Sequence, residues 1–177
     1  MTDRSHTTFD SPIGPLTAVA DGEALCGLYL DGERHQEPDA VLGREDRFLG
    51  EVQAQLDAYF DGTLTDFDLP LAPAGTPFQR QVWAALCDIA YGSTTTYGEL
   101  AASIGRPGAA RAVGLANGRN PIPIVVPCHR VIGAGGALTG YAGGLERKRW
   151  LLDHERTERA PALLGSCRCI GCDSVTQ

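Results

Sequence analysis

The sequence lacks any apolar run of about 20 residues, the length that a helix needs to cross a bilayer. Residues 1–6 also lack the apolar core of a secretory signal peptide. These absences predict a cytoplasmic protein without a membrane partner. In that compartment we expect the six cysteines to be mostly free thiols rather than a disulfide framework.

Basic residues are scarce overall, because Lys and Arg number 15 against 22 Asp and Glu, for a net charge of −7. That deficit argues against a nucleic-acid partner, but the charges are unevenly distributed. Residues 1–76 carry 4 basic and 15 acidic side chains, whereas residues 77–152 carry 8 basic and 3 acidic ones. Since phosphate binding follows the local field, the basic half remains compatible with a polyanionic partner at one face.

A chain of 177 residues with 43% hydrophobic content suits one domain or two small ones packed together. Its first part, residues 1–75, predicts a small α+β module with a three-stranded sheet. The expected elements are a hairpin over residues 9–30 that turns at Asp21-Gly22, a polar loop at 31–43, an amphipathic helix at 44–60 and an edge strand at 67–71. No polar side chains converge there, so we expect this module to be structural.

Residues 76–160 predict a mostly helical domain. Thr76 and Thr96 are each followed three residues later by Gln or Glu, the capping-box pattern that begins a helix. The expected helices cover residues 77–90, 97–104 and 107–117, and Gly105 ends the second of them. Two short helices joined by a tight glycine-containing turn are typical of a helix-turn-helix.

The third of these helices consists almost entirely of small residues, and Arg111 is the long side chain near its start. A helix of this kind can lie very close to another surface. If that surface is DNA, Arg111 is the side chain that would probe the base stack. Tight packing against another helix, with Arg111 at the surface, explains the pattern equally well.

A candidate nucleophile lies in the segment Pro127-Cys128-His129-Arg130, which follows the apolar run 122–126. The neighbouring His and Arg favour a thiolate, the nucleophilic form of cysteine. Prolines at positions 121, 123 and 127 exclude an ordinary central strand or helix interior, and so predict a rigid presenting segment. Adjacent residues of an extended chain point to opposite faces, so the chain must turn here if His129 is to act on Cys128, directly or through a water.

Beyond the nucleophile the sequence predicts a hairpin, a flexible loop and a last helix. The expected positions are a hairpin with strands at 131–132 and 137–138, a glycine-rich loop at 141–144 and a helix at 145–156. The tail, residues 161–177, is expected to be disordered. Its Cys167, Cys169 and Cys172 have spacing compatible with zinc or copper, but no fourth ligand is near, and we predict no metal site.

Together these motifs resemble the O6-alkylguanine-DNA alkyltransferases, also called methylated-DNA–protein-cysteine methyltransferases. The resemblance extends from about Phe9 to Glu155. It is carried by Pro127-Cys128-His129-Arg130-Val131-Ile132-Gly133, with support from Ser11-Pro12-Ile13-Gly14-Pro15-Leu16, Ala110-Arg111-Ala112-Val113-Gly114, Asn120-Pro121, Tyr141 with Gly143-Gly144, and Trp150-Leu151-Leu152 with His154-Glu155. Some members of the family hold zinc in the N-terminal module, but here Cys26 has no convincing set of partners.

The resemblance implies a reaction with DNA as the substrate. The protein would bind duplex DNA through the minor groove, and Arg111 would fill the place of a guanine that flips into a pocket. Cys128 would then take the alkyl group from O6 of guanine, and also from O4 of alkylated thymine, in a single irreversible turnover without a cofactor. Glu155, His129 and a water would draw off the thiol proton.

Further roles follow from the same resemblance. Tyr97 would protonate guanine N3, and Asn120 would brace the turns around Cys128. The remaining DNA contacts would come from Thr96, Ala110, Ala112, Gly114 and Asn117, and the pocket would be lined by Pro123, Val131, Tyr141, Ala142 and Gly143. The partner would be double-stranded DNA that contains O6-alkylguanine, bound by a protein that is monomeric in solution and capable of cooperative assembly on DNA.

Three other interpretations compete with this one. A non-catalytic lesion binder would lack the reactive cysteine, which is present here. A Cys-His-Glu hydrolase would act through a thioester and leave the Arg111 helix unexplained. A redox or metal sensor that uses the tail would keep its function after Cys128→Ser and lose it after truncation at Pro161.

Overall fold

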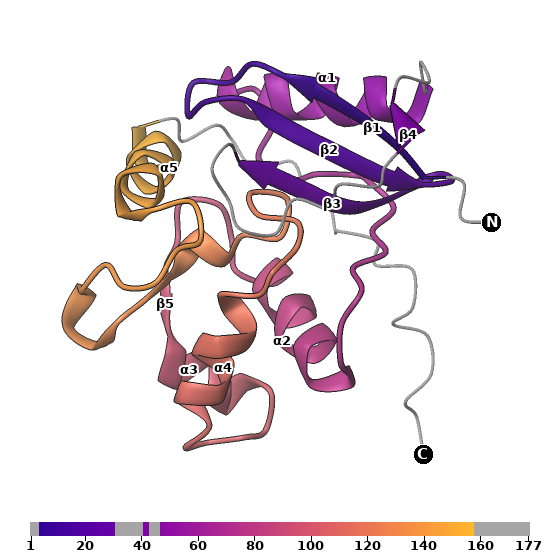
Figure 1. The fold of residues 1–177 in the computed structure, drawn as a ribbon. Coiled ribbons are helices and arrows are strands. Elements are labelled where there is room, and N and C mark those ends of the chain that lie inside the picture. The colour runs from indigo at the N-terminus through magenta and orange to yellow at the C-terminus, as the bar shows by residue number, and fades with distance from the viewer. Residues whose placement is uncertain (1–3, 31–40, 43–46, 158–177) are drawn as a thin grey trace.

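The computed structural model describes residues 4–30, 41–42 and 47–157. The N-terminal region, up to residue 73, forms a four-stranded sheet covered by one helix (Figure 1). Its elements are β1 (Arg4–Phe9), β2 (Leu16–Asp21), β3 (Ala24–Leu30), β4 (Val41–Leu42) and α1 (Arg47–Phe60). The strand order is β3-β2-β1-β4, in which β1, β2 and β3 are antiparallel neighbours and β4 runs parallel to β1. The α+β class is therefore confirmed.

The predicted hairpin is present, and its turn has the left-handed backbone that glycine adopts without strain, with φ of 59° at Gly22. The composition of the sheet differs from the prediction. The expected edge strand at 67–71 is absent, since only Leu71 forms an isolated bridge to Leu25. Arg4–Phe9 forms a strand instead, although its polar sequence RSHTTF carries little hydrophobic signal. Of the predicted polar loop, residues 31–40 and 43 lie outside the described residues, and Val41–Leu42 pairs with β1.

The C-terminal region, residues 77–157, is mostly helical. It contains α2 (Pro77–Cys87), β5 (Thr95–Thr96), α3 (Tyr97–Ser103), α4 (Ala110–Asn117), the 3₁₀ turn η1 (Cys128–Arg130), β6 (Val131–Ile132), the 3₁₀ turn η2 (Ala134–Gly136) and α5 (Leu145–Thr157). Both predicted capping boxes are present, at Thr76 with Gln79 and at Thr96 with Glu99. Helix α2 ends at Cys87 rather than near residue 90, and α4 begins at Ala110 rather than at Pro107.

The predicted pairing of strands 131–132 and 137–138 was wrong. Val131–Ile132 pairs in parallel with Thr95–Thr96, 36 positions earlier in the chain. The glycines instead form η2, which is closed by a 2.8 Å hydrogen bond from Gly133 N to Ala137 O. No local sequence pattern predicts a pairing between strands so far apart in the chain, whereas the glycines do predict the turn.

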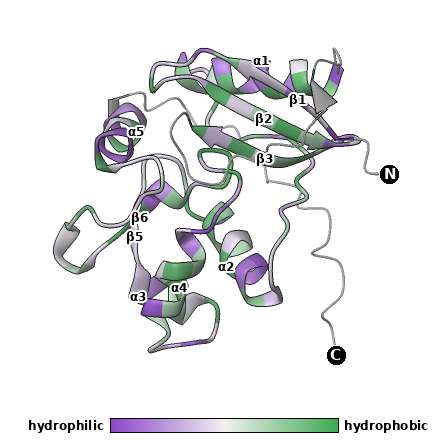
Figure 2. Cartoon of the chain, viewed as in Figure 1, coloured by the Kyte–Doolittle hydropathy of each residue, from purple (hydrophilic) through white to green (hydrophobic). Residues whose placement is uncertain are grey.

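One hydrophobic core runs through both regions, from Leu16 and Leu56 to Val113 and Leu151. Helix α5 packs against this core although most of its residues are hydrophilic, as its colour in Figure 2 shows. It nevertheless buries Leu151, Lys148 and Glu155 completely. Within the described residues, no helix is long and apolar enough to span a membrane.

Candidate active site

The apolar segment 122–126 is buried, and Pro127 joins it to Cys128. Asn120 braces its turn on both sides, since Nδ2 donates to Val126 O at 2.8 Å and Oδ1 accepts from Ile122 N at 3.0 Å. Between them Ile124 has φ of 75°, a left-handed conformation that is unusual for a β-branched residue. Such backbone strain persists only where the surroundings enforce it, and it clusters at functional sites.

At Cys128 the chain turns, as an interaction between neighbouring thiol and imidazole requires. Cys128, His129 and Arg130 form the 3₁₀ turn η1, in which Arg130 N donates to Pro127 O at 3.0 Å. All three side chains are buried, with exposed fractions of 5%, 0% and 5%. The sequence therefore places a thiol, an imidazole and a guanidinium inside the protein rather than on its surface.

Glu155 on α5 collects most of the polar contacts of this turn. Its Oε1 accepts from His129 Nε2 at 2.7 Å, from Arg130 Nη2 at 2.9 Å and from Tyr59 Oη at 2.9 Å. Its Oε2 accepts from Arg130 Nε at 2.9 Å and from Gly92 N at 3.1 Å. Arg130 is held further by Ile89 O at 2.6 Å. A buried carboxylate with this many donors has a fixed orientation.

The electrostatics of the cluster determine which imidazole nitrogen carries the proton. Burial alone would raise the pKa of Glu155, but the hydrogen bonds and charges of His129 and Arg130 outweigh it and hold the pKa well below its usual range. Burial lowers the pKa of His129, and Glu155, already neutralised by Arg130, opposes this only in part. His129 is therefore neutral near pH 7. Since an ionised carboxylate only accepts, Nε2 carries the hydrogen and Nδ1 carries the lone pair.

His129 Nδ1 is buried and has no hydrogen-bond partner among the described residues. It is the basic nitrogen of the ring, and it belongs to the residue next to Cys128. A neutral base held by a carboxylate, beside a thiol, is the arrangement that activates a cysteine nucleophile.

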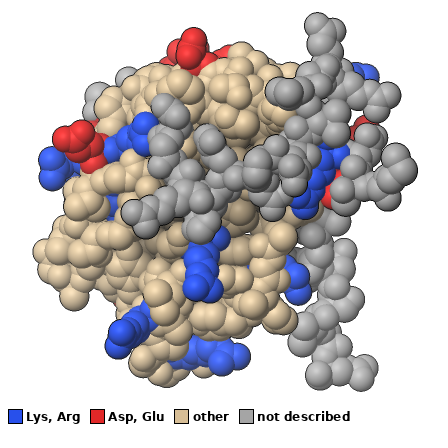
Figure 3. All heavy atoms as spheres, in the orientation of Figure 1, with Lys and Arg blue, Asp and Glu red and all other residues tan. Residues whose placement is uncertain are grey.

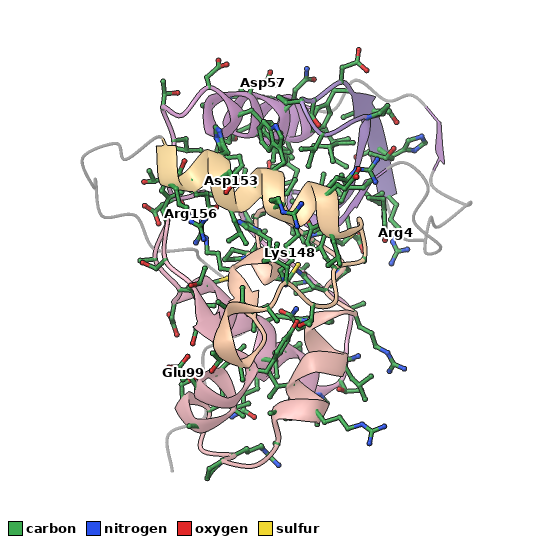
Figure 4. The ribbon with its side chains drawn as sticks, turned by 90° about the vertical axis from the view of Figure 1, so that its left-hand side faces the viewer. Arg4, Asp57, Glu99, Lys148, Asp153 and Arg156 are labelled. Carbon is green, nitrogen blue, oxygen red and sulfur yellow. The ribbon has the colours of Figure 1, made fainter. Side chains whose placement is uncertain are left out.

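Lys148 also comes from α5 and is completely buried. Its Nζ donates to Val131 O at 2.6 Å and to Thr139 O at 2.8 Å, which ties η1 and β6 to the following loop. Burial lowers the pKa of Lys148, and the nearby Cys128 opposes that shift. In Figure 4 Lys148, Asp153 and Arg156 lie along one helix, and the last two are at least 60% exposed. The buried lysine therefore has a role that its neighbours on the helix do not share.

A group of exposed basic residues lies on a different part of the molecule. Figure 3 shows Lys and Arg over the lower part, which Figure 1 identifies as α2, α3 and α4, without a visible acidic side chain there. The exposed arginines of this region are Arg80, Arg106, Arg111 and Arg119. On α4, Arg111, Ala112 and Leu115 are exposed, whereas Val113 and Ala116 are buried. The helix therefore presents one face with small side chains and an arginine.

Comparison with known proteins places these features in a family. Residues 5–73 match the ribonuclease-like domain of 6-O-methylguanine DNA methyltransferase, and residues 77–157 match the DNA-binding domain of the same family. The methylated-DNA–protein-cysteine methyltransferase of Mycobacterium bovis is 55% identical over 163 residues, which is 89% of this chain and 94% of the relative. The enzyme of Methanosarcina acetivorans is 54% identical over 152 residues, or 85% of this chain and 97% of the relative.

Solved structures agree with the sequence matches. The crystal structure of the Mycobacterium tuberculosis protein OGT in complex with DNA has a TM-score of 0.78 at 52% identity, covering 89% of this chain and 96% of that one. This chain belongs to the 6-O-methylguanine DNA methyltransferase family. The resemblance read from the motifs is therefore confirmed, and so is the class of enzyme, a methylated-DNA–protein-cysteine methyltransferase.

Some site residues expected from the family have other surroundings here. Thr96 is the N-cap of α3, and its Oγ1 accepts from Glu99 N at 3.2 Å. Gly114 faces the Tyr97 ring, because a Cβ at this position would lie 3.6 Å from the ring. Asn117 is 3% exposed and donates from Nδ2 to Cys128 O at 3.4 Å, so it does not lie on the exposed face of α4. Of these three positions, Asn117 alone is buried, whereas Thr96 and Gly114 are partly exposed.

The pocket residues expected from the family surround the same segment. Val131 and Pro123 are buried beside Cys128 in the chain, Tyr141 is partly buried and Ala142 is exposed. Gly143 packs against the N-terminal region, since a Cβ there would meet Leu30 Cδ1 at 2.6 Å and Tyr141 Cε1 at 2.9 Å. A side chain at position 143 would therefore require Leu30, Tyr141 or the loop itself to move.

Two members of the cluster were missed by sequence reasoning. Tyr59 belongs to α1, in the module expected to be only structural, yet its hydroxyl reaches Glu155 and its carbonyl accepts from His154 Nε2 at 2.8 Å. The helical spacing of apolar residues identified Tyr59 only as a core aromatic residue. Lys148 lies in a run of charged residues that is typical of a surface. Among the described residues no group of three or more His, Cys, Asp or Glu could hold a metal, and the tail cysteines lie outside them.

Proposed function

We propose that this protein repairs DNA by transferring the alkyl group of O6-alkylguanine irreversibly to Sγ of Cys128. The observation that carries the proposal is the buried Glu155–His129 pair next to that cysteine, with Nδ1 of a neutral imidazole as the basic nitrogen. No cofactor is needed, since the alkylated base brings the group to be transferred. Alkylated O4 of thymine offers the same kind of carbon–oxygen bond and is a second expected substrate.

The thiol proton passes to His129 Nδ1, directly or through a water, and Sγ attacks the alkyl carbon in line with its bond to O6. The S–C bond forms as the C–O6 bond breaks, and the electron pair of that bond goes to the purine. Tyr97 donates its hydroxyl proton to guanine N3, so the base leaves as neutral guanine. The imidazolium proton returns to Tyr97 through solvent, and the thioether remains on Cys128.

DNA would approach from the side of α3 and α4. Helix α4 presents Ala112 and Arg111 on an exposed surface that also carries Arg106 and Arg119. Small residues allow the helix to lie deep in the minor groove, and an arginine can occupy the space of an extruded base. The relative of known structure that was crystallised with DNA is similar to this chain over 89% of its length, which supports the same partner. We also infer that residues 1–75 and 76–160 act as two domains around one core.

The experiment is intact and peptide mass spectrometry after mixing with excess duplex that contains one O6-methylguanine. We expect one methyl group per chain, located on Cys128, with no further turnover. Cys128→Ser should bind the duplex and remain unmodified. An unmodified Cys128 in correctly folded wild-type protein would overturn the proposal, and hydrolysis of thioester or ester substrates would then be tested.

A further inference from the structure

Asn117 ends helix α4, the helix proposed to enter DNA, and its side chain points inward. Nδ2 donates to Cys128 O, but at 3.4 Å the hydrogen bond is long. The same carbonyl already accepts from Val131 N, so it does not depend on Asn117 for a partner. Oδ1 is buried without any hydrogen-bond partner among the described residues.

The buried Asn117 amide does not contribute to the stability of the folded state. A buried amide with an unpaired oxygen destabilises the folded state, and an apolar side chain of similar size would avoid that cost. Val113 and Ala116 on the same helix are buried and apolar, as the core requires. The polar side chain at position 117 therefore has a reason other than packing.

Tyr97 is the neighbour that provides such a reason. Its ring packs over Gly114, one turn before Asn117 on α4, and its hydroxyl donates to Thr139 O at 3.2 Å. Asn117 follows Gly114 by one turn of α4, so its amide lies next to Tyr97 and lowers the pKa of the tyrosine. Burial raises the pKa of Tyr97 and the nearby Cys128 adds to that rise, whereas Thr139 and, to a smaller extent, Asn117 oppose it. A donor in this place favours the form of Tyr97 that has lost its proton.

We propose that Asn117 is a positioning residue that holds the Tyr97 oxygen and stabilises it when Tyr97 gives its proton to the departing guanine. Nδ2 is the donor, because the carbonyl of Cys128 requires the amide nitrogen on that side. When the proton moves from Tyr97 to guanine N3, the Tyr97 oxygen gains negative charge and the hydrogen bond from Nδ2 strengthens. The weak contact with Cys128 O leaves the amide available for this second acceptor.

The inference rests on the proposed function, since it requires that Tyr97 protonates N3. It also connects the DNA-binding helix to the reaction. Arg111 at the start of α4 and Asn117 at its end lie on opposite faces, one exposed and the other buried. The same short helix would therefore extrude the base with one residue and assist its departure with another.

A substrate comparison tests the inference. Single-turnover methyl transfer is measured with duplexes that contain O6-methylguanine or its 3-deaza analogue, which has a CH group in place of N3. We expect Asn117→Leu to slow the reaction with O6-methylguanine about tenfold, the effect of one hydrogen bond to a developing charge. With the 3-deaza duplex the variant should react as fast as the wild type.

Two further variants test whether the effect depends on the hydrogen-bond donor of Asn117 and on Tyr97. Asn117→Asp has nearly the same shape but no donor, and it should lose at least as much as Asn117→Leu. In a Tyr97→Phe background, Asn117→Leu should have no additional effect. Folding is checked by the melting temperature, which should not fall in Asn117→Leu, and by alkylation of Cys128 with iodoacetamide at the wild-type rate.

The outcomes separate this inference from the function on which it rests. An equal loss on both duplexes, or additive losses with Tyr97→Phe, would overturn the role of Asn117 and leave the alkyl transfer intact. Equal wild-type rates on the two duplexes would overturn proton donation by Tyr97 and the role of Asn117 with it. Absence of methyl on Cys128 in the mass spectrum would overturn the proposed function itself.

Discussion

The N-terminal and C-terminal regions differ in charge and in what they contribute to the site. The N-terminal sheet and helix belong to the half that carries 4 basic and 15 acidic residues, and they supply a single side chain to the cluster, Tyr59. The C-terminal region supplies Cys128, His129 and Glu155, as well as the exposed arginines around α4. Under the proposed function, substrate binding and chemistry are thus concentrated in this region.

The comparison also shows why the acidic half matters. Glu155 lies where the two regions meet, and its Oε1 accepts from His129 on one side and from Tyr59 on the other. Tyr59 is completely buried, and burial together with the charge of Glu155 raises its pKa, so it stays a donor. A region without a reactive group still orients the carboxylate on which the base depends. Four predictions test this division.

The largest effect is expected from Arg130→Met, which removes the cation that neutralises a completely buried carboxylate. Breaking a buried ion pair by removing one partner costs about 3–5 kcal/mol of unfolding free energy. Urea denaturation measures the loss. Arg156→Met is the matched control, because the 3.3 Å pair between Arg156 and Asp153 is exposed on the same region of the chain. Similar losses of unfolding free energy in both variants would show that the buried ion pair stabilises the fold no more than the exposed one.

Arg111→Ala should weaken the reaction with duplex DNA but not the reaction with the free base. Because base extrusion costs a few kcal/mol, losing the residue that fills the gap should slow duplex repair roughly 100-fold. Reaction with free O6-benzylguanine should remain near the wild-type rate. Arg149→Ala is the control, since Arg149 is an exposed arginine on α5, outside the surface that carries Arg111. Equal losses on both substrates would eliminate the insertion role.

Tyr59→Phe tests the contribution of the N-terminal region. It removes one hydrogen bond to a charged group while keeping the ring, so we expect a loss of about 1.5–3 kcal/mol in unfolding free energy. Methyl transfer should slow severalfold, and the dissociation constant for duplex DNA should stay unchanged. Tyr29→Phe on β3 is the control for the reaction and should leave the rate of methyl transfer unchanged. An unchanged rate in Tyr59→Phe would confine the chemistry to the C-terminal region after all.

The smallest effect is the dependence of stability on pH. The folded-state pKa values of His129 and Glu155 both lie below their ordinary values of 6.5 and 4.5, so the unfolded chain binds more protons as the pH falls. Stability should be complete above pH 6.5, decline below it because of His129, and decline further below 4.5 because of Glu155. The slope is about 1.4 kcal/mol per pH unit for each proton taken up.

Thermal denaturation at a series of pH values measures this profile. His129→Gln removes the first titrating group, so the decline between pH 6.5 and 4.5 should flatten while the one below 4.5 remains. An unchanged slope between these values in the variant would assign the effect to other groups.

Local patterns predicted much of the fold because their causes lie within a few residues. The capping boxes at Thr76 and Thr96 join a side chain to the backbone three positions away, and both were found as expected. The turn at Asp21-Gly22 is equally local. The strand Arg4–Phe9 was missed because it is polar, and it becomes a strand by pairing along its whole length with β2. Its stability comes from its neighbours rather than from its own composition.

The family, the Cys128-His129 motif and the helix-turn-helix could be read from the chain alone, because each is a contiguous motif. The groups that surround Glu155, the burial of Lys148 and the burial of Asn117 became apparent only in the folded protein. Tyr59 and Glu155 are separated by 96 positions, and His129 and Glu155 by 26. Contacts over such separations form only when the two regions close around one core, and no local pattern specifies them.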